Sequence, residues 1–257
     1  MSVSLKIFLV PNIPDIQFGD KLEGIIGDNL HKSSIGLRNG DILCIAHKVV
    51  SKAEGCLVDL ENIIPSNTAN LYAKELNKDP RKVQVILNES KKVIRSFKHS
   101  KQNEGVMICE HNLGFISANA AVDESNVGKT SKVITLPKNP DKSARYINKK
   151  LDARFGVKIG VLITDTFGRP WRIGQVNVCV GISGIPVTKK EQGMKDAWGR
   201  RLYVSEPAFA DEIAAASGLV MFKSAKTPVV LFRGLEWERG SSVISDILRN
   251  ENEDMFR

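Results

Sequence analysis

Short runs of apolar residues, each bounded by glycine, proline or polar residues, recur along the chain and predict β-strands. These runs cover residues 4–10, 40–50, 160–165, 175–184 and 228–235. A longer stretch, 105–122, has apolar positions on both sides of Asn112, Leu113 and Gly114. It predicts a hairpin that turns at these three residues.

Apolar residues at intervals of three and four predict helices over 67–78, 80–97, 139–156 and 206–221. The first has an Asn cap and the second begins at a proline, which suits the first turn of a helix. The third has Asp and Ser near its start and Gly156 after its end, a common way for a helix to stop.

Strands and helices alternate only loosely along the chain, and several strands are joined as hairpins. This order favours a mixed α/β (α+β) fold with mixed sheets over a regular doubly wound sheet. The chain is interpreted as one domain, residues 1–257, with a smaller subdomain folding out after about residue 70. A GxxxxGK[ST] loop and a strand-linked GxGxxG are both absent from the sequence, so it predicts neither a P-loop nor a Rossmann site.

The composition is that of a globular protein, with 42% hydrophobic and 26% charged residues among 257. No apolar run approaches the ~20 residues that cross a bilayer, and Pro11 and Pro14 interrupt the apolar N-terminus. We therefore expect a cytoplasmic protein with no membrane partner. The four cysteines are widely spaced and predict free thiols. Cys109 and His111 would share one face of a strand, as a packed pair does.

The formal net charge of +8 is compatible with nucleic acid, a membrane surface or small anions as partners. The basic stretches 90–102 and 145–150 alternate with apolar positions at helical spacing, and no aromatic platform accompanies them. We interpret them as solvated helix faces, and we expect no nucleic-acid partner.

Two turns rich in oxygen-bearing side chains are the candidate chemistry. Asp165 and Thr166 follow the apolar run 160–163, and a carboxylate there either caps a turn or holds a cation. The stretch 117–128 likewise leads from small residues to Asp123, Ser125 and Asn126. Two such turns in one chain favour a shared metal and phosphate site over two unrelated caps, and oxygen ligands suit Mg²⁺ or Mn²⁺.

Cationic side chains complete this candidate site. Arg169 and Arg172 flank a rigid Pro-Trp pair, and we interpret them as an anion clamp for phosphate or carboxylate. His47, Lys48 and Lys52 are further cations, placed around a strand. The loop 11–14 is fixed by its prolines and is a candidate wall for a base or ribose. Solvated lysines and an ordinary turn explain these last two features equally well.

Together these motifs resemble the coenzyme F420-0:L-glutamate ligase family over nearly the whole chain. The segments that carry the resemblance are VPNIPDIQFGDKL, GDILCIAHKVVSKAEG, NLGFISANAAVDESNVG, LPKNPDKSARYI, VLITDTFGRPWRIGQVNVCVGISGI, DEIAAASGLVM and PVVLFRG, in this order. DTFGRPWRIG is the most specific of them. The chain resembles the stand-alone archaeal form, because it is too short for the fusion to a flavin-reductase-like domain.

The resemblance implies a GTP-dependent ligase that adds L-glutamate to coenzyme F420-0 and F420-1 through γ-glutamyl amide bonds. Because a carboxylate is a poor acyl donor, we expect this reaction to pass through an acyl phosphate. It implies Mg²⁺ or Mn²⁺, stimulation by K⁺, and an intertwined homodimer of two-subdomain chains. It also implies that Asp123, Asp165 and Thr166 hold metal ions. The positions that it implies for contact with the nucleotide are Pro11, Asn12, Ile13, Pro14, His47, Lys48, Lys52, Asn126, Met221, Phe222, Lys223 and Ser224.

Three alternatives stay open at the level of sequence. A related carboxylate-amine ligase acting on another phosphorylated acceptor would carry the same motifs. An RNA-binding protein on the same scaffold would have lost the metal turns, yet Asp123 and Asp165-Thr166 are present. A flavin or deazaflavin oxidoreductase is expected to carry a dedicated redox group or a nicotinamide fingerprint, and the sequence has neither.

Overall fold

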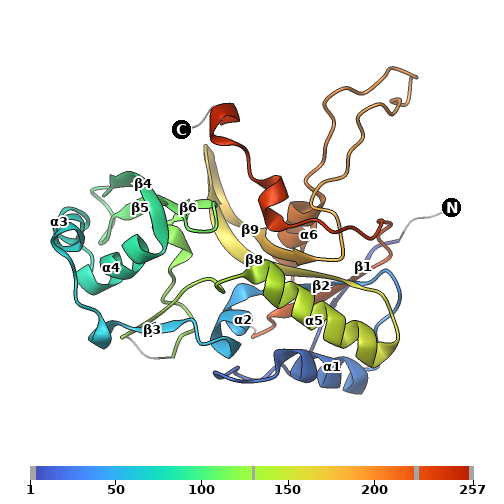
Figure 1. Cartoon of the computed structure of the whole chain (residues 1–257), viewed down its shortest axis with the longest axis horizontal. Coiled ribbons are helices and arrows are strands. Elements are labelled where there is room, and N and C mark those ends of the chain that lie inside the picture. Colours follow the sequence, from blue (N-terminus) through green and yellow to red (C-terminus); the bar gives the residue numbers. More distant parts are fainter. Residues whose placement is uncertain (1–3, 129–130, 223–225, 255–257) are drawn as a thin grey trace.

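A computed structural model of the chain describes residues 4–128, 131–222 and 226–254. Its centre is a mixed five-stranded sheet in the order β1-β10-β2-β8-β9 (Figure 1). Strands β2 and β8 run parallel, and the other neighbours are antiparallel. The strands are β1 (Lys6–Leu9), β2 (Ile42–Ala46), β8 (Gly160–Arg169), β9 (Arg172–Ser183) and β10 (Val229–Arg233). The prediction of a mixed α/β fold is therefore confirmed.

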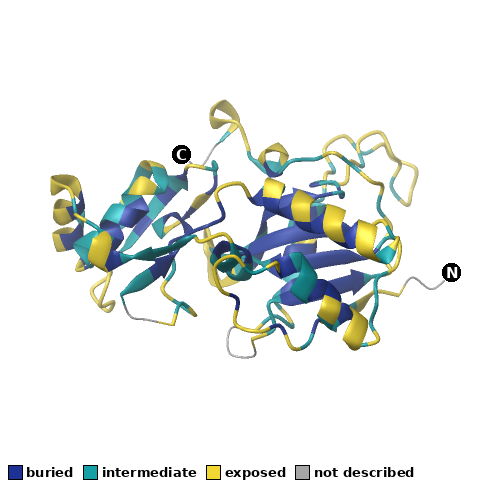
Figure 2. Cartoon of the chain, turned by 60° about the horizontal axis from the view of Figure 1, so that its bottom comes forward, coloured by how far each residue is buried: buried dark blue, intermediate teal, exposed yellow. Residues whose placement is uncertain are grey.

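Helices cover both faces of this sheet. Helix α5 (Pro140–Phe155) packs on β8 and β9 with α1 (Leu22–Lys32) beside it, and α6 (Phe209–Ser217) packs behind β9 (Figure 1). Because the inner strands are buried on both faces, they are continuously apolar, as in the ILCI of β2 and the VVLF of β10. The burial pattern in Figure 2 places the sheet and the inner stripes of its helices in one core.

The local signals of α5 behave as predicted. Asn139 accepts a hydrogen bond from the Lys142 amide, and Pro140 takes the first turn. Gly156 then ends the helix at a φ of 66°, a conformation that favours glycine. The predicted helix at 206–221 also exists, but it is shorter and covers Phe209–Ser217.

A second group of elements lies to one side, between β2 and β8 in the chain (Figure 1). It contains helices α3 (Asn67–Leu76) and α4 (Pro80–Asn88), and the three-stranded sheet of β4 (Ser90–Phe97), β5 (Val106–His111) and β6 (Ile116–Ala118). A two-stranded sheet, β3 (Leu57–Asp59) with β7 (Lys132–Ile134), connects this group to the central sheet. Its buried side chains form a separate cluster from Leu60 to Val133. The subdomain boundary near residue 70 stays a prediction.

The hairpin predicted over 105–122 lies in this second group, where β5 and β6 form it. The hairpin turns after His111, whose amide donates to the carbonyl of Phe115, as predicted. Cys109 and His111 are both buried, and all four cysteines are free thiols.

The predicted helix over 80–97 is wrong in its second half. The chain leaves the helix after Asn88 and forms β4, which pairs with β5. Register shifts between Ser90 and Lys92 and between Val93 and Arg95 interrupt the alternation of side chains along β4. These irregularities placed its apolar residues at intervals that resemble a helix. The basic stretch that begins at residue 90 is thus largely a strand and not a helix face.

The predicted strand over 40–50 is likewise too long. Strand β2 ends at Ala46, and His47–Ala53 form helix α2. The predicted strands over 160–165 and 175–184 are, in contrast, too short, because β8 and β9 extend through the loop expected between them. Only Pro170 and Trp171 remain as the turn, and Trp171 adopts a φ of 57°.

The remaining elements are short. Single-turn 3₁₀ helices cover Leu60–Asn62, Asn119–Ala121, Ile244–Ile247 and Glu251–Glu253. Residues 184–208 form a long excursion between β9 and α6 (Figure 1). Among the residues that the structure describes, no helix is both long and apolar enough to cross a membrane.

Candidate functional site

A cleft of about 390 Å³ opens where β2 ends and its parallel pairing with β8 stops. Ala46, the last residue of β2, pairs with Thr164 in the parallel register, and β8 continues past this point to Arg169, paired with β9 alone. The residues that follow this last parallel pair are His47 at the start of α2 and Asp165 within β8, and they are thereby brought together. The cleft is lined by residues 13–17, 46–49, 52, 57, 126–128, 164–166, 177, 221, 222 and 226–228.

Helix α2 places two pairs of side chains at this edge, each four residues apart. His47 and Ser51 face inward, where both are fully or almost fully buried. His47 Nδ1 lies 3.2 Å from Ser51 Oγ. Lys48 and Lys52 occupy the neighbouring face and line the cleft. Residues four apart share one face of a helix, so α2 separates a supporting pair from a cationic pair.

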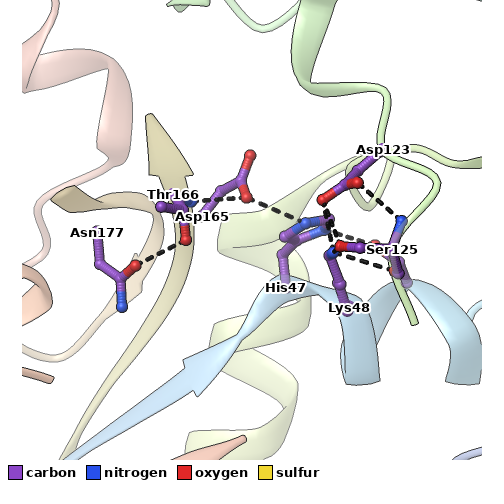
Figure 3. Close-up of polar contacts among 8 residues, drawn as sticks. His47, Lys48, Asp123, Ser125, Asp165, Thr166 and Asn177 are labelled. Atoms are coloured by element: carbon purple, nitrogen blue, oxygen red, sulfur yellow. Dashed lines mark hydrogen bonds and ion pairs between the residues drawn. The ribbon is translucent and has the colours of Figure 1, made fainter. Parts of the chain in front are cut away.

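His47, directly after β2, and Asp165, within β8, lie beside each other at this edge. His47 Nε2 lies 3.2 Å from Asp165 Oδ1, an ion-pair distance that lacks the angle of a hydrogen bond. The Asp165 side chain is only 12% exposed, and the same oxygen accepts a 2.7 Å hydrogen bond from the Thr166 amide. Figure 3 shows the carboxylates of Asp165 and Asp123 on either side of His47 and Lys48.

Lys48 anchors the second oxygen-rich turn. Its Nζ donates to Asp123 Oδ2 at 2.6 Å, to the Ser125 carbonyl at 3.1 Å and to the Ser125 hydroxyl. The Ser125 amide also donates to Asp123 Oδ1 at 2.8 Å. Burial alone would raise the pKa of Asp123, but the hydrogen bonds from Lys48 and Ser125 outweigh it and hold this pKa well below its ordinary value. Asp123 is therefore a carboxylate at neutral pH.

Thr166 and Asn177 form the wall on the β8–β9 side. The Thr166 hydroxyl donates to Asn177 Oδ1 at 2.8 Å, and Asn177 Nδ2 donates to Ser217 Oγ on α6 at 3.2 Å. Sequence reasoning missed Asn177. Its position directly opposite Thr166 in the hairpin is the signal that identifies it, once the register is known.

The opposite wall holds a further ion pair that the sequence did not reveal. Lys52 Nζ donates to Asp15 Oδ1 at 2.6 Å. This hydrogen bond is the main reason why the pKa of Asp15 lies below its ordinary value, and burial opposes it only partly. Lys226 and Thr227 also line this part of the cleft.

The structure thus brings together most of the candidate residues. Those that line the cleft are Ile13, Pro14, His47, Lys48, Lys52, Asn126, Asp165, Thr166, Met221 and Phe222. Asp123 lies at the edge of the cleft, where it accepts a hydrogen bond from the lining residue Lys48. Pro11 and Asn12 precede the lining part of their loop, and Lys223 and Ser224 lie outside the described residues.

Arg169 and Arg172 lie elsewhere, at the exposed tip of the β8–β9 hairpin. Arg169 Nη2 donates to the carbonyl of Ile173 across the turn at 2.7 Å. Neither arginine is among the described residues that line the cleft. Their interpretation as an anion clamp stays a prediction, and the structure of this single chain does not place them beside Asp165.

The oxygen donors of the cleft have the chemistry that suits a divalent cation, but they are too few to complete its coordination. Asp123, Ser125, Asp165, Thr166 and Asn177 present carboxylate, hydroxyl and amide oxygens, which Mg²⁺ and Mn²⁺ prefer. Across residues 4–128, 131–222 and 226–254, no three His, Cys, Asp or Glu side chains form a group that could hold a metal ion. A cation here would complete its coordination with water and ligand oxygens, as Mg²⁺ usually does.

The fold and the cleft define a mixed α/β protein whose cleft lies beyond the carboxyl end of the parallel pairing of β2 with β8, a usual position for the site of an α/β enzyme. Residues 11–234 match the F420-0:Gamma-glutamyl ligase family. The chain belongs to this family, which confirms the resemblance drawn from the sequence.

Relatives from archaea are similar over most of their length. The coenzyme F420:L-glutamate ligase of Methanopyrus kandleri is 42% identical, covering 99% of this chain and 98% of its own. The proteins of the same name from Methanocaldococcus jannaschii and Methanothermobacter thermautotrophicus are 41% and 37% identical. The first alignment covers 86% of both chains, and the second covers 99% of this chain and all of the relative.

Proposed function

We propose that the protein is a ligase that joins L-glutamate to coenzyme F420-0, and to the F420-1 product, through γ-glutamyl amide bonds. The observation that carries this proposal is the match over nearly the whole chain to relatives named coenzyme F420:L-glutamate ligase. The cleft supports it, because it gathers most of the residues that the family resemblance marks.

GTP is the proposed source of energy. A volume of about 390 Å³ lies within the range of about 300–1,000 Å³ that is common for small-molecule sites. Lys48, Lys52 and Lys226 provide cations for phosphate oxygens, while Ile13, Pro14 and Phe222 provide apolar wall for a base or ribose.

Asp123, Asp165 and Thr166 are the proposed ligands of Mg²⁺ or Mn²⁺, which would neutralise charge on the phosphate oxygens. The low pKa of Asp123 supports this role, because a hard cation prefers an ionised carboxylate. His47 would hold the carboxylate of Asp165 in place through its 3.2 Å contact. Stimulation by K⁺ belongs to the same proposal, without an assigned residue.

The proposed reaction passes through an acyl phosphate. An oxygen of the acceptor carboxylate attacks the γ-phosphorus of GTP, and the bond from that phosphorus to the bridging oxygen of GDP breaks. The neutral amine of L-glutamate then attacks the carbonyl carbon, inorganic phosphate leaves, and the nitrogen loses a proton. Such a transfer depends on positioning and charge neutralisation more than on a protein nucleophile. The cations of the cleft fit that requirement.

A homodimer is the proposed assembly. Large apolar side chains are strongly exposed at the hairpin tip and along the excursion 184–208, and a partner surface would cover them. Examples are Ile173 at 100%, Trp198 at 93% and Val204 at 90% exposure. Size-exclusion chromatography with light scattering would report twice the chain mass of 28.3 kDa, and a single-chain mass would reject the dimer.

Mass spectrometry of the product tests the function directly. The purified protein is incubated with F420-0, L-glutamate, GTP and Mn²⁺, beside Asp165→Ala and a control variant, Asp211→Asn, whose carboxylate lies on α6 outside the cleft lining. We expect mass gains in whole glutamyl units, lost in Asp165→Ala and kept in Asp211→Asn. A folded protein that binds GTP but adds no glutamate would favour the alternative, a related carboxylate-amine ligase with a different acceptor.

A further inference from the structure

Lys82 on α4 is a buried lysine that lies outside the cleft and yet contacts the turn that forms part of it. Its side chain is 7% exposed. The Nζ atom donates to Glu124 Oε2 at 2.6 Å and to Glu104 Oε2 at 3.1 Å. A second buried lysine, Lys78, donates to the same Glu104 oxygen at 2.7 Å. Two lysines and two glutamates therefore balance each other in this cluster.

The turn that follows β6 presents alternate side chains to two different partners. Asp123 and Ser125 face Lys48 at the cleft, whereas Glu124 between them faces Lys82. On the N-terminal side, the backbone of Asp123 pairs with that of Ile134 in both directions. Among the described residues, Glu124 is thus the side chain that anchors the turn on the side away from the cleft.

A stabilising role alone explains this arrangement poorly. Taking a lysine out of water is costly, and a hydrophobic residue of similar size often stabilises a protein as much as a buried ion pair does. Helix α4 already buries Val83 and Ile86 in the second core cluster. A charged Lys82 at this place instead fixes the direction of one particular carboxylate, Glu124.

We propose that Lys82 is a positioning residue, which holds Glu124 so that Asp123 and Asn126 keep their orientation toward the cleft before any ligand binds. This inference rests on the proposed function for its effect on GTP, because that function makes Asp123 a metal ligand and Asn126 a nucleotide contact. Without the anchor, the turn exchanges between conformations, and binding must first select the competent one. If that conformation is populated about a tenth of the time, the apparent affinity falls about tenfold.

The test compares Lys82→Met with Lys78→Met. Both variants remove a buried lysine and an ion pair with Glu104, but only Lys82→Met releases Glu124. We expect Lys82→Met to raise the KM for GTP about tenfold with little change in kcat, because saturating ligand restores the turn. Hydrogen–deuterium exchange of a peptide covering 119–128 should become severalfold faster in Lys82→Met and stay unchanged in Lys78→Met.

Glu124→Met is the second variant, for the case that Lys82→Met does not fold. Its side chain cannot accept from Lys82 as a carboxylate does, and Lys82 stays paired with Glu104. We expect it to reproduce the effects of Lys82→Met, and we expect the double variant to add nothing further. Equal effects of Lys82→Met and Lys78→Met, or an unchanged KM in folded Lys82→Met or Glu124→Met, would overturn the positioning role. If the wild-type chain neither binds GTP nor forms product, the proposed function fails, and the exchange of 119–128 still decides whether Lys82 holds the turn.

Discussion

Ion pairs determine the state of the cleft's carboxylates. Asp123 and Asp15 each accept a 2.6 Å hydrogen bond from a lysine of α2, and both have a pKa below the ordinary value. Under the proposed function, a bound phosphate would compete with these carboxylates for the lysines, and nucleotide binding would exchange one anionic partner for another. A carboxylate with a backbone amide as its main partner behaves differently, and Asp211 is the example.

Asp211 lies in the first turn of α6 and accepts a 2.9 Å hydrogen bond from the Cys179 amide. Burial raises its pKa, and the amide offsets this only partly. Since the folded pKa exceeds the unfolded one, the stability linked to this group is complete below the unfolded pKa and is lost as pH rises through the folded pKa. Ionised Asp211 therefore destabilises the fold at neutral pH.

Asp211→Asn keeps an oxygen that can accept from Cys179 and removes the charge. We expect its free energy of unfolding, relative to the wild type, to rise between pH 4 and pH 7, by roughly 1 kcal/mol or less for a partly buried carboxylate. Urea denaturation of both proteins at several pH values measures this difference. A difference that stays constant with pH would contradict the assigned effect of burial.

Secondary-structure elements show which features the sequence can predict. Helix α5 follows its local signals, because the Asn139 cap and the Gly156 stop act within one turn of the chain. Strand β4 does not, since its irregular pairing with β5 is set by residues far along the sequence. Helix α2 was missed for a related reason, as the apolar pair Val49 and Val50 continues the strand pattern of β2.

In the candidate site, too, local features were predictable from the sequence and tertiary features were not. The oxygen-rich turns and the lysines are recognisable from residue types alone, and the structure brings them into one cleft. Asn177 is identified only by the register of the β8–β9 hairpin, and Asp15 only by its contact with Lys52. Both are features of the tertiary structure, which local sequence does not reveal. The tip of the hairpin could not be placed from sequence, because nothing local indicates that β8 and β9 extend to Arg169 and Arg172.

Close packing between α5 and β9 leads to a prediction about Gly181. A Cβ atom there would lie 2.4 Å from Pro140 Cβ and 2.7 Å from its carbonyl carbon. Backbone cannot move away cheaply, so Gly181→Ala should lower the free energy of unfolding by about 1–3 kcal/mol. Gly168→Ala in β8 is the control, because a Cβ there meets no atom within 4 Å. Equal stabilities in chemical denaturation would show that α5 adjusts to the added methyl group.

The hairpin tip carries the remaining test of the anion clamp. If Arg172 contacts a phosphate or carboxylate during the reaction, Arg172→Ala should raise a substrate KM or lower kcat by about tenfold or more, the effect of losing a charge-assisted hydrogen bond. Arg169→Ala should be compared, although it also loses the bond to the Ile173 carbonyl. Unchanged turnover and Michaelis constants in Arg172→Ala would remove this arginine from the proposed site.

The charge of the whole molecule contrasts with that of the cleft. The chain has 37 Lys and Arg against 29 Asp and Glu, a formal net charge of +8. At the cleft, among the described residues, Lys48, Lys52 and Lys226 are matched by Asp15, Asp165 and the adjoining Asp123. Under the proposed function, attraction of anionic substrates from a distance would therefore come from the surface as a whole, and such long-range attraction is screened by salt.

Ionic strength consequently provides a test at the scale of the molecule. Raising it from about 0.05 to 0.3 M shortens the screening length from roughly 14 to 6 Å, so the KM for GTP should rise severalfold while kcat changes little. Choline chloride is the suitable salt, because K⁺ and the divalent cation can then be held constant. A KM that does not respond would mean that contacts inside the cleft attract the nucleotide, since close and partly buried pairs are screened far less than distant surface charges.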